Sequence, residues 1–188
     1  MQVLIKIAAA TLILGAASSA AMADGFYGAI DFGQTKANGA CVGAGAGIAG
    51  CEDTATAYRI ASGYQFSPQW GAEISYGKYG KASLGTNSGT ALGDWKLSGV
   101  QIAATGAFPL GDALALTAKV GVARTDLELT AVPLAASSTK ATVGVGVRYV
   151  YTRGVAFRAQ YEYLGEVGDA VTGTARVGFL SVGAMFAF

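Results

Sequence analysis

Apolar and polar residues alternate one by one along most of this chain after its first two dozen residues. The final stretch, RVGFLSVGAMFAF, shows the pattern clearly: Leu180, Val182 and Phe186 share one parity, whereas Ser181 lies on the other. A period of two is typical of a β-strand with unlike faces. An exposed edge strand in a soluble protein rarely ends on Met-Phe-Ala-Phe, because unpaired edges need charge or proline. The strand is therefore predicted either to lie inside a sandwich or to close a barrel that faces lipid.

Seven further stretches alternate in the same way, and the eight predicted strands lie near 25–34, 55–66, 70–79, 95–108, 113–125, 141–151, 155–164 and 177–188. Three connections are short and contain Pro or Gly, as tight turns do: 67–69, 109–112 and 152–154. The other four are longer, small and polar: 35–54, 80–93, 126–140 and 165–176. Short turns at one end and long loops at the other are typical of outer-membrane barrels. The sequence therefore predicts an all-β fold, an eight-stranded antiparallel up-and-down transmembrane β-barrel.

Alternation alone does not say which face points inward. A soluble lipocalin-like barrel would place the apolar set inside and would carry a polar exterior dense in Lys and Glu. Here the polar set consists mostly of Gly, Ala, Ser, Thr and Gln, with about one charge per strand. Small residues suit the crowded interior of an eight-stranded barrel, and Tyr and Phe near strand ends resemble aromatic girdles. The apolar set is therefore predicted to face lipid, with a soluble secreted barrel or sandwich as the alternative.

The first 23 residues have the features of a cleaved signal peptide. Lys6 precedes an apolar run at 7–17, and Ala21-Met22-Ala23 is a suitable cleavage site. The predicted barrel domain is then 24–188. Charged residues make up only 13% of the chain, about half the usual share of a soluble domain. No apolar run of 18 or more residues follows the signal, which argues against membrane helices.

Charge and composition exclude several classes of function. Lys and Arg number 13 and Asp and Glu 12, and removal of the signal takes one lysine, so the balance gives no case for a nucleic-acid partner. The chain has no histidine. That excludes Ser-His-Asp and Cys-His catalysis and removes the commonest metal ligand. We therefore expect no enzymatic activity, no cofactor and no metal site.

Charged residues on the inward parity are the most informative candidates. Buried charges must be paired and hydrogen-bonded, so ion pairs across the lumen are expected. Such a network could act as the gate of a narrow pore, or it could fix strand register and block the lumen. The predicted network consists of Asp31, Arg59, Glu73, Lys119, Arg148, Arg158 and Glu162.

Two cysteines, Cys41 and Cys51, flank the glycine-rich run VGAGAGIAG in the first long loop. In an exported chain this pair predicts one disulfide, with two free thiols as the alternative. Closing so short a loop would contribute roughly 2–3 kcal/mol in the chain-entropy model. The expected role is to stiffen an exposed loop.

Five segments in order resemble the OmpA-like family, the eight-stranded transmembrane domain of outer membrane protein A and its small relatives. They are GFYGAIDFGQ, GYQFSPQWGAEISYGKYG, GVQIAATGAFPLGDALAL, GVGVRYVYTRGVAFRAQYEYLGEVGDA and GFLSVGAMFAF. The resemblance implies a monomer in a Gram-negative outer membrane, with both termini periplasmic and without the peptidoglycan-binding domain. It also implies contact with outer-membrane lipids and lipopolysaccharide. Periplasmic chaperones and the barrel assembly machinery would act during biogenesis, with Phe188 as the C-terminal assembly signal.

The resemblance also bears on function. It places Glu73 and Arg158 where relatives carry a Glu–Arg pair that plugs the lumen. It departs at Arg148, where the best-known member has an acid, and at Thr105, where that member has a lysine, so the partner switch of that pair is not expected here. The predicted function is mainly structural, with loops that could bind host or phage ligands. The alternative is a low-conductance pore or small-solute channel gated by the interior charges.

Overall fold

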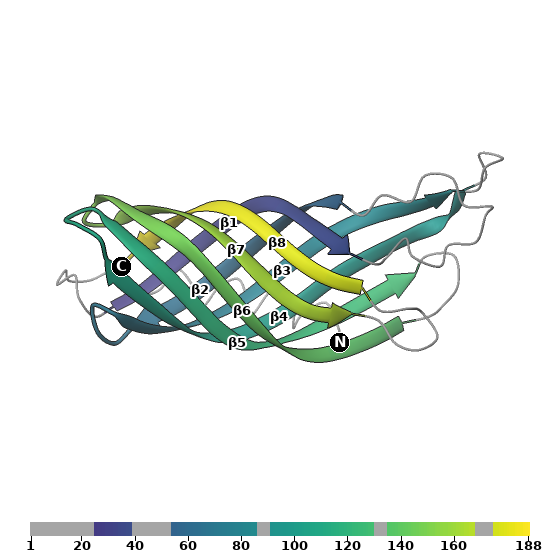
Figure 1. Ribbon diagram of the computed structural model, residues 1–188, viewed down its shortest axis with the longest axis horizontal. Helices are drawn as coiled ribbons and strands as arrows, with labels where there is room; N and C mark the ends of the chain where they lie inside the picture. Colours follow the sequence, from purple (N-terminus) through teal and green to yellow (C-terminus); the bar gives the residue numbers. More distant parts are fainter. Residues whose placement is uncertain (1–24, 39–53, 86–90, 130–134, 168–174) are drawn as a thin grey trace, which may run out of the picture.

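Eight antiparallel strands form a closed barrel in a computed structural model of the protein, which describes residues 25–38, 54–85, 91–129, 135–167 and 175–188 (Figure 1). The strands are β1 (Gly25–Asn38), β2 (Thr54–Gln65), β3 (Trp70–Gly85), β4 (Ala91–Pro109), β5 (Leu114–Leu129), β6 (Ala135–Thr152), β7 (Val155–Val167) and β8 (Ala175–Ala187). Each strand pairs with its neighbours in sequence, and β8 pairs with β1. Within these ranges, no helix is long and apolar enough to span a membrane. The predicted fold class is confirmed.

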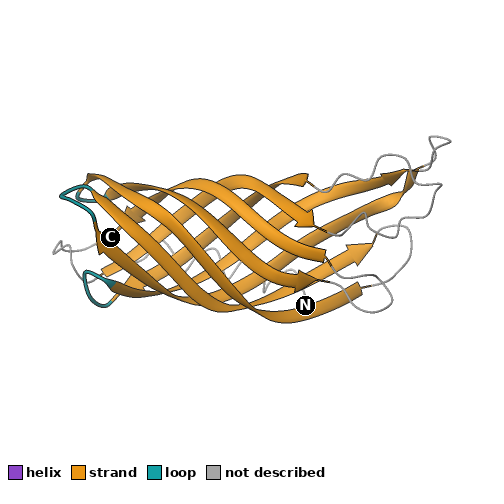
Figure 2. Cartoon of the chain, in the orientation of Figure 1, coloured by secondary structure: helices purple, strands orange, loops and turns teal. Residues whose placement is uncertain are grey.

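The three short connections lie together at one end of the barrel, which we call the turn end (Figure 2). The C-terminus is held there, because the backbone N–H of Phe188 donates to the carbonyl of Phe26 over 2.9 Å. The opposite end, where β1 ends and β2 begins, is called the loop end. The predicted disulfide partners Cys41 and Cys51 and the predicted signal peptide lie outside the described residues, so both remain predictions.

All eight strands extend further toward the loop end than the sequence pattern indicated, β3 and β6 the most. β3 continues to Gly85, β4 begins at Ala91, β5 continues to Leu129 and β6 begins at Ala135, and β1 and β7 continue to Asn38 and Val167. The loop boundaries predicted at 35–54, 80–93, 126–140 and 165–176 were therefore wrong. Backbone pairing continues beyond the apolar band because antiparallel ladders need no apolar side chain. The register of β3 against β4 shifts between Lys78 and Lys81, and Gly80 takes a φ of 127° at this irregularity, a conformation that favours glycine.

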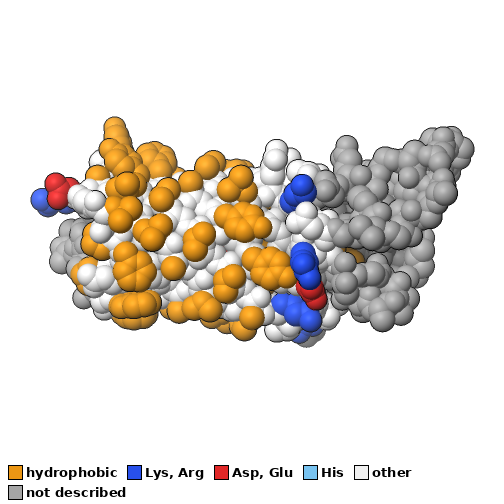
Figure 3. Space-filling view, in the orientation of Figure 1, with side chains coloured by type: hydrophobic (Ala, Val, Ile, Leu, Met, Phe, Trp, Pro, Cys, Tyr) orange, Lys and Arg blue, Asp and Glu red, His pale blue; other side chains and the backbone are white. Residues whose placement is uncertain are grey.

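The apolar parity faces outward, as predicted. Val145 and Val182 are 61% and 64% exposed, whereas the inward-facing Asp31 and Arg59 are fully buried. Figure 3 shows hydrophobic side chains spread over the visible face of the barrel wall, in a band that stops before the loop end. Aromatic pairs mark the turn end of the band, including Phe26–Tyr64, Trp70–Phe108 and Tyr151–Phe157. This is the distribution expected of a lipid-facing surface with an aromatic girdle.

Candidate functional site

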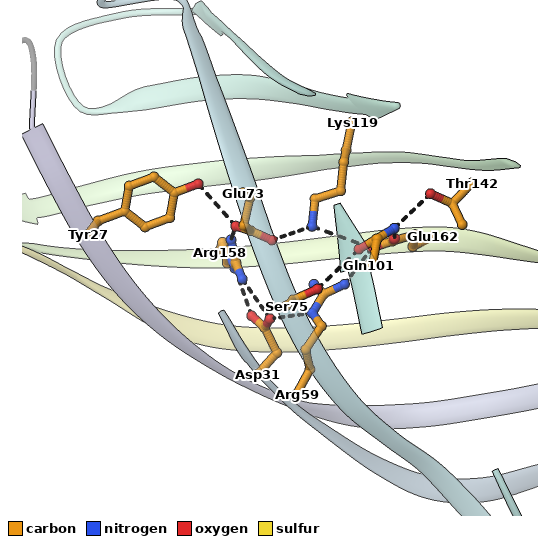
Figure 4. A network of polar contacts seen from close by, with 10 residues as sticks. All are labelled: Tyr27, Asp31, Arg59, Glu73, Ser75, Gln101, Lys119, Thr142, Arg158 and Glu162. Atoms are coloured by element: carbon orange, nitrogen blue, oxygen red, sulfur yellow. Dashed lines mark hydrogen bonds and ion pairs between the residues drawn. The ribbon is translucent and has the colours of Figure 1, made fainter. Parts of the chain in front are cut away.

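Six charged side chains meet inside the barrel and form a closed ring of alternating sign (Figure 4). Each carboxylate contacts two cations, and each cation contacts two carboxylates. All six residues are at most 9% exposed. With three charges of each sign, the set is formally neutral. We call it the charge ring; in order around the ring it consists of Asp31, Arg158, Glu73, Lys119, Glu162 and Arg59.

Glycines on the facing strands make room for these side chains. Gly183 on β8 lies directly opposite both Asp31 on β1 and Arg158 on β7. A Cβ at Gly183 would collide with Asp31 Oδ1, and a Cβ at Gly63 would collide with the ring of Tyr27. The high glycine content of the inward parity is therefore a packing requirement, since the interior of an eight-stranded barrel is just wide enough for its side chains.

Arg158 holds one half of the ring together. Its Nε lies 2.7 Å from Asp31 Oδ1 and its Nη2 2.7 Å from Asp31 Oδ2, a bidentate arrangement. Its Nη1 donates to Glu73 Oε2 over 2.7 Å, and the hydroxyl of Tyr27 donates to the same oxygen over 3.1 Å. Charge-assisted, bidentate contacts of this kind are the strongest hydrogen bonds in proteins. They join β1, β3 and β7 directly across the lumen.

Lys119 and Arg59 complete the ring. Lys119 Nζ lies 2.6 Å from Glu73 Oε1 and 3.6 Å from Glu162 Oε2. Arg59 Nη1 donates to Glu162 Oε2 over 2.5 Å, and its Nε lies 3.0 Å from Asp31 Oδ2. No carboxylate in the ring is left without a cation, which is the condition for tolerating buried charge.

Neutral side chains extend the network to two more strands. The amide of Gln101 on β4 donates to Glu162 Oε1 and, over 2.7 Å, to Thr142 Oγ1 on β6. Its oxygen accepts from the hydroxyl of Ser75 over 3.2 Å. The sequence analysis did not place Tyr27, Gln101 or Thr142 among the network residues. Their inward parity, shared with the charged residues on the same strands, was the signal that could have found them.

Arg148 was predicted to belong to the interior network, and the structure places it outside the charge ring. It is half-buried nearer the turn end, where Nη1 lies 3.3 Å from Gln65 Oε1. Among the described residues it forms no ion pair. The reason lies in the register: Arg148 sits directly opposite Arg158, which already occupies Asp31 and Glu73.

The missing lysine at Thr105 is compensated from the next strand. Thr105 on β4 lies directly opposite Lys119 on β5. The Lys119 ammonium therefore reaches Glu73, which contacts a lysine and Arg158 at the same time. The departure from the family pattern at position 105 does not deprive Glu73 of a lysine partner.

An apolar layer fills the lumen between the charge ring and the loop end. The rings of Tyr79 and Phe179 meet edge to face, with centroids 5.4 Å apart. The Arg59 guanidinium lies 5.3 Å from the Phe179 centroid, so the two layers touch. We define the apolar layer as the buried cluster Ala37, Ala57, Tyr79, Leu97, Leu164, Val177 and Phe179.

On its other side, the charge ring borders a polar cavity toward the turn end. Gln65, Thr105, Arg148 and Gln160 line this cavity together with ring residues. Its volume, counted as the space open to the centres of water molecules, is about 40 Å³. Since one water needs at least about 10–15 Å³ of such space, the cavity can hold a few waters. The lumen thus passes from polar cavity to charge ring to apolar layer.

Comparison with known proteins shows the family to which this barrel belongs. The OmpA-like transmembrane domain matches residues 21–188. This chain belongs to that family. Outer membrane protein A of Salmonella typhi is 34% identical over 137 residues, which cover 67% of this chain and 38% of that protein. The Klebsiella pneumoniae protein of the same name is 30% identical over 136 residues, 67% of this chain and 39% of that protein. The match therefore spans about two-fifths of the length of these relatives.

Solved structures agree with the family assignment. Neisserial surface protein A superposes with a TM-score of 0.63 at 25% identity, covering 88% of this chain and 99% of that chain. Ail, the attachment invasion locus protein of Yersinia pestis, gives 0.56 at 15% identity, covering 87% and 99%. OprG of Pseudomonas aeruginosa gives 0.57 at 14%, covering 87% and 97%. The last two likenesses show the fold alone. The protein is an outer-membrane β-barrel of Gram-negative bacteria, a class in which short turns face the periplasm.

Proposed function

We propose that this barrel is a closed structural element of the outer membrane that holds its loop-end connections at the cell surface. The observation that carries the proposal is the closed charge ring. Each of its members is held by two oppositely charged partners contributed from strands around the barrel. An open aqueous path would have to break several of these contacts together, and each broken pair would leave a buried charge without its partner.

The apolar layer supports the same proposal independently. Phe179 and Leu164 are at most 1% exposed, and they pack toward the loop end beyond the ring. Ions crossing this layer would lose their hydration, and the Tyr79 hydroxyl is the one polar side-chain group of the defined layer that could replace it. A conducting state would therefore need two different rearrangements, one of ion pairs and one of packed rings.

Binding of host or phage ligands by the loop-end connections remains part of this proposal. The extension of β3 to β6 beyond the apolar band supports it, because those strands carry their connections away from the membrane surface. The experiment is to display the protein on cells and to measure adhesion to host extracellular matrix before and after shaving the loops with protease. Adhesion that survives removal of the loops would contradict a loop-borne ligand site.

The runner-up function, a low-conductance pore, is favoured by one specific observation. The polar cavity reaches Glu73, Lys119 and Arg158 from the turn end, so this side of the charge ring has room for a few water molecules. Glu73 contacts Lys119 and Arg158 together, and a shift between these two partners could open the ring without leaving Glu73 unpaired.

Single-channel recording in planar bilayers separates the two functions. We would compare the wild type with Glu73→Gln, Phe179→Ala and the double variant, after checking folding by the gel shift between unboiled and boiled samples. The outward-facing Val120→Ala serves as the control, since it leaves the lumen intact. A closed structural barrel predicts silence from the wild type and both single variants, with openings in the double variant only. Wild-type openings whose conductance changes in Glu73→Gln would establish the pore instead.

A further inference from the structure

The polar cavity beside the charge ring is lined by two hydrogen-bond donors that the chain leaves unpaired. Arg148 Nε and Gln160 Nε2 are shielded from solvent, and neither has a hydrogen-bond partner among the described residues. Both side chains line the cavity. Each of these nitrogens can donate a hydrogen bond but cannot accept one. Because folded proteins rarely leave a buried donor without an acceptor, the pair indicates an acceptor that comes from outside the chain.

The strand register brings these two donors close together. Arg148 on β6 lies directly opposite Arg158 on β7, and Gln160 follows Arg158 by two residues on the same inward face. Arg148 and Gln160 are therefore diagonal neighbours, at the spacing of about 7–8 Å that long side chains can bridge. One small acceptor between the two side chains can receive hydrogen bonds from both.

The cavity also carries an excess of positive charge. Its lining contains three cations, Lys119, Arg148 and Arg158, and one acid, Glu73. Figure 4 shows Lys119, Arg158 and the Tyr27 hydroxyl all directed at Glu73, so both oxygens of this carboxylate are already engaged. The charge ring as a whole is neutral, which leaves the Arg148 guanidinium as uncompensated charge. Like charges directly opposite each other destabilise a sheet, and an anion beside Arg148 would offset its repulsion from Arg158.

The size of the cavity limits the kind of anion. A volume of about 40 Å³ has room for a few water molecules, and a bare halide ion is little larger than one of them. A sugar phosphate or an acidic peptide would need far more space. A water molecule in the same place would bring two O–H donors of its own, which would need further acceptors. The Gln65 oxygen already accepts from Arg148 Nη1 over 3.3 Å. An acceptor-only ion therefore fits the two unpaired donors better than water does.

We propose that the polar cavity is a binding site for one small monovalent inorganic anion of the chloride class. Arg148 provides the positive charge and its Nε–H, and Gln160 provides an amide N–H. The site lies on the turn-end side of the charge ring, which faces the periplasm in this class of barrel. The proposal goes beyond the structural function argued above and does not depend on whether the lumen conducts.

The test is chloride binding to the folded barrel in a zwitterionic detergent, measured by broadening of the chloride NMR line. Sodium gluconate keeps the ionic strength constant during the titration. The test variants are Arg148→Gln, which removes the charge, and Gln160→Met, which removes only the amide. The matched control is Arg153→Gln, the same substitution in an exposed turn at the same end of the barrel. The gel shift between unboiled and boiled samples checks folding of each variant.

We expect the wild type and Arg153→Gln to bind chloride equally. Arg148→Gln should bind at least about tenfold more weakly, because a hydrogen bond from a charged donor is lost. Gln160→Met should bind about threefold more weakly, as expected for a neutral donor. Bromide should displace chloride from the wild type, whereas gluconate is too large for the cavity and should not.

Urea unfolding gives a second readout, because an anion that binds only the folded barrel stabilises it. Replacing gluconate by chloride should raise the urea midpoint of the wild type and of Arg153→Gln more than that of Arg148→Gln. A folded wild type that does not broaden the chloride line would overturn the proposal, as would equal binding by the wild type and Arg148→Gln. A loss in Arg153→Gln as large as that in Arg148→Gln, or displacement of chloride by gluconate as readily as by bromide, would show general attraction of anions to the surface and would also overturn it.

Discussion

The charge ring and the apolar layer are neighbours in one lumen, and they close it by different means. The ring consists of directional contacts of 2.5–3.6 Å between charged groups that are almost completely removed from water. The apolar layer relies on close packing of side chains such as Tyr79 and Phe179. Such packing does not depend on ion pairs or hydrogen bonds with particular partners. Arg59 takes part in both, through its carboxylates on one side and the Phe179 ring on the other.

This difference shows what the charge ring and the apolar layer each contribute to stability and to strand register. Desolvating six charges offsets much of their mutual attraction, so an intact ring adds little net stability but strongly disfavours any register that separates its members. The apolar layer adds stability in proportion to the area it removes from water and specifies register only through shape. We therefore expect the ring to be intolerant of single changes, and the apolar layer to respond in a graded way.

The largest expected effect comes from removing one ring member. Arg158→Ala leaves Asp31 with one cation and Glu73 with one, both still buried, and we expect a loss of about 3–5 kcal/mol in the free energy of unfolding. The measurement is urea-induced unfolding in lipid vesicles, followed by tryptophan fluorescence. Arg148→Ala is the matched control. It removes the same side chain from the same lumen, but one without an ion pair among the described residues, so its cost should stay below about 1 kcal/mol.

Equal urea midpoints for Arg158→Ala and Arg148→Ala would contradict the conclusion that the ion pairs of the charge ring make Arg158 the more important arginine. The comparison also tests the register argument, since Arg148 and Arg158 face each other directly across β6 and β7. The two arginines are therefore neighbours in the sheet, but Arg148 lies nearer the turn end, with Gln65 as its partner in place of the carboxylates of the charge ring.

A smaller effect is expected in the apolar layer. Leu164→Ala removes a side chain that is 1% exposed and leaves a cavity that rigid strands cannot close, for a loss of about 3 kcal/mol. Leu180→Ala on the outer wall, where Leu180 is 61% exposed, loses only the transfer contribution of about 2 kcal/mol, because lipid chains fill the gap. The same urea titration measures both. A Leu180→Ala loss as large as that of Leu164→Ala would mean that the lumen collapses around the deletion and is not rigidly packed.

Much of this architecture could be predicted from the sequence, because a barrel wall converts residue parity directly into inside and outside. Parity placed Asp31, Glu73 and Arg158 on one face, and the small, weakly charged residues of that face indicated that it points inward. The strand extensions beyond the apolar band were not predictable in this way, since polar residues there occupy both faces and the alternation disappears. In these extensions, the strands are continued by backbone hydrogen bonding to the neighbouring strands alone.

The partners within the lumen were harder to predict than the faces. Parity gives the side of the wall but not the height, and height depends on the stagger between strands. This is why Arg148 was grouped with the ion pairs, and why the substitution at Thr105 suggested a lost lysine. The structure shows Lys119 directly across from Thr105, so the ammonium is supplied by the neighbouring strand.

The smallest expected effect comes from removing one tyrosine hydroxyl beside the charge ring or one in the apolar layer. Tyr27 and Tyr79 are both buried tyrosines on inward positions, but the Tyr27 hydroxyl donates to Glu73 Oε2 over 3.1 Å. The Tyr79 hydroxyl has no hydrogen-bond partner among the described residues. Tyr27→Phe should therefore cost about 1–2 kcal/mol in unfolding free energy, as expected for a hydrogen bond to a charged group. Tyr79→Phe should cost nothing measurable or stabilise the barrel slightly, because it removes an unsatisfied buried polar atom. A loss in Tyr79→Phe equal to that in Tyr27→Phe would show that its hydroxyl is engaged with the neighbouring Arg59 and that the polar network continues into the apolar layer.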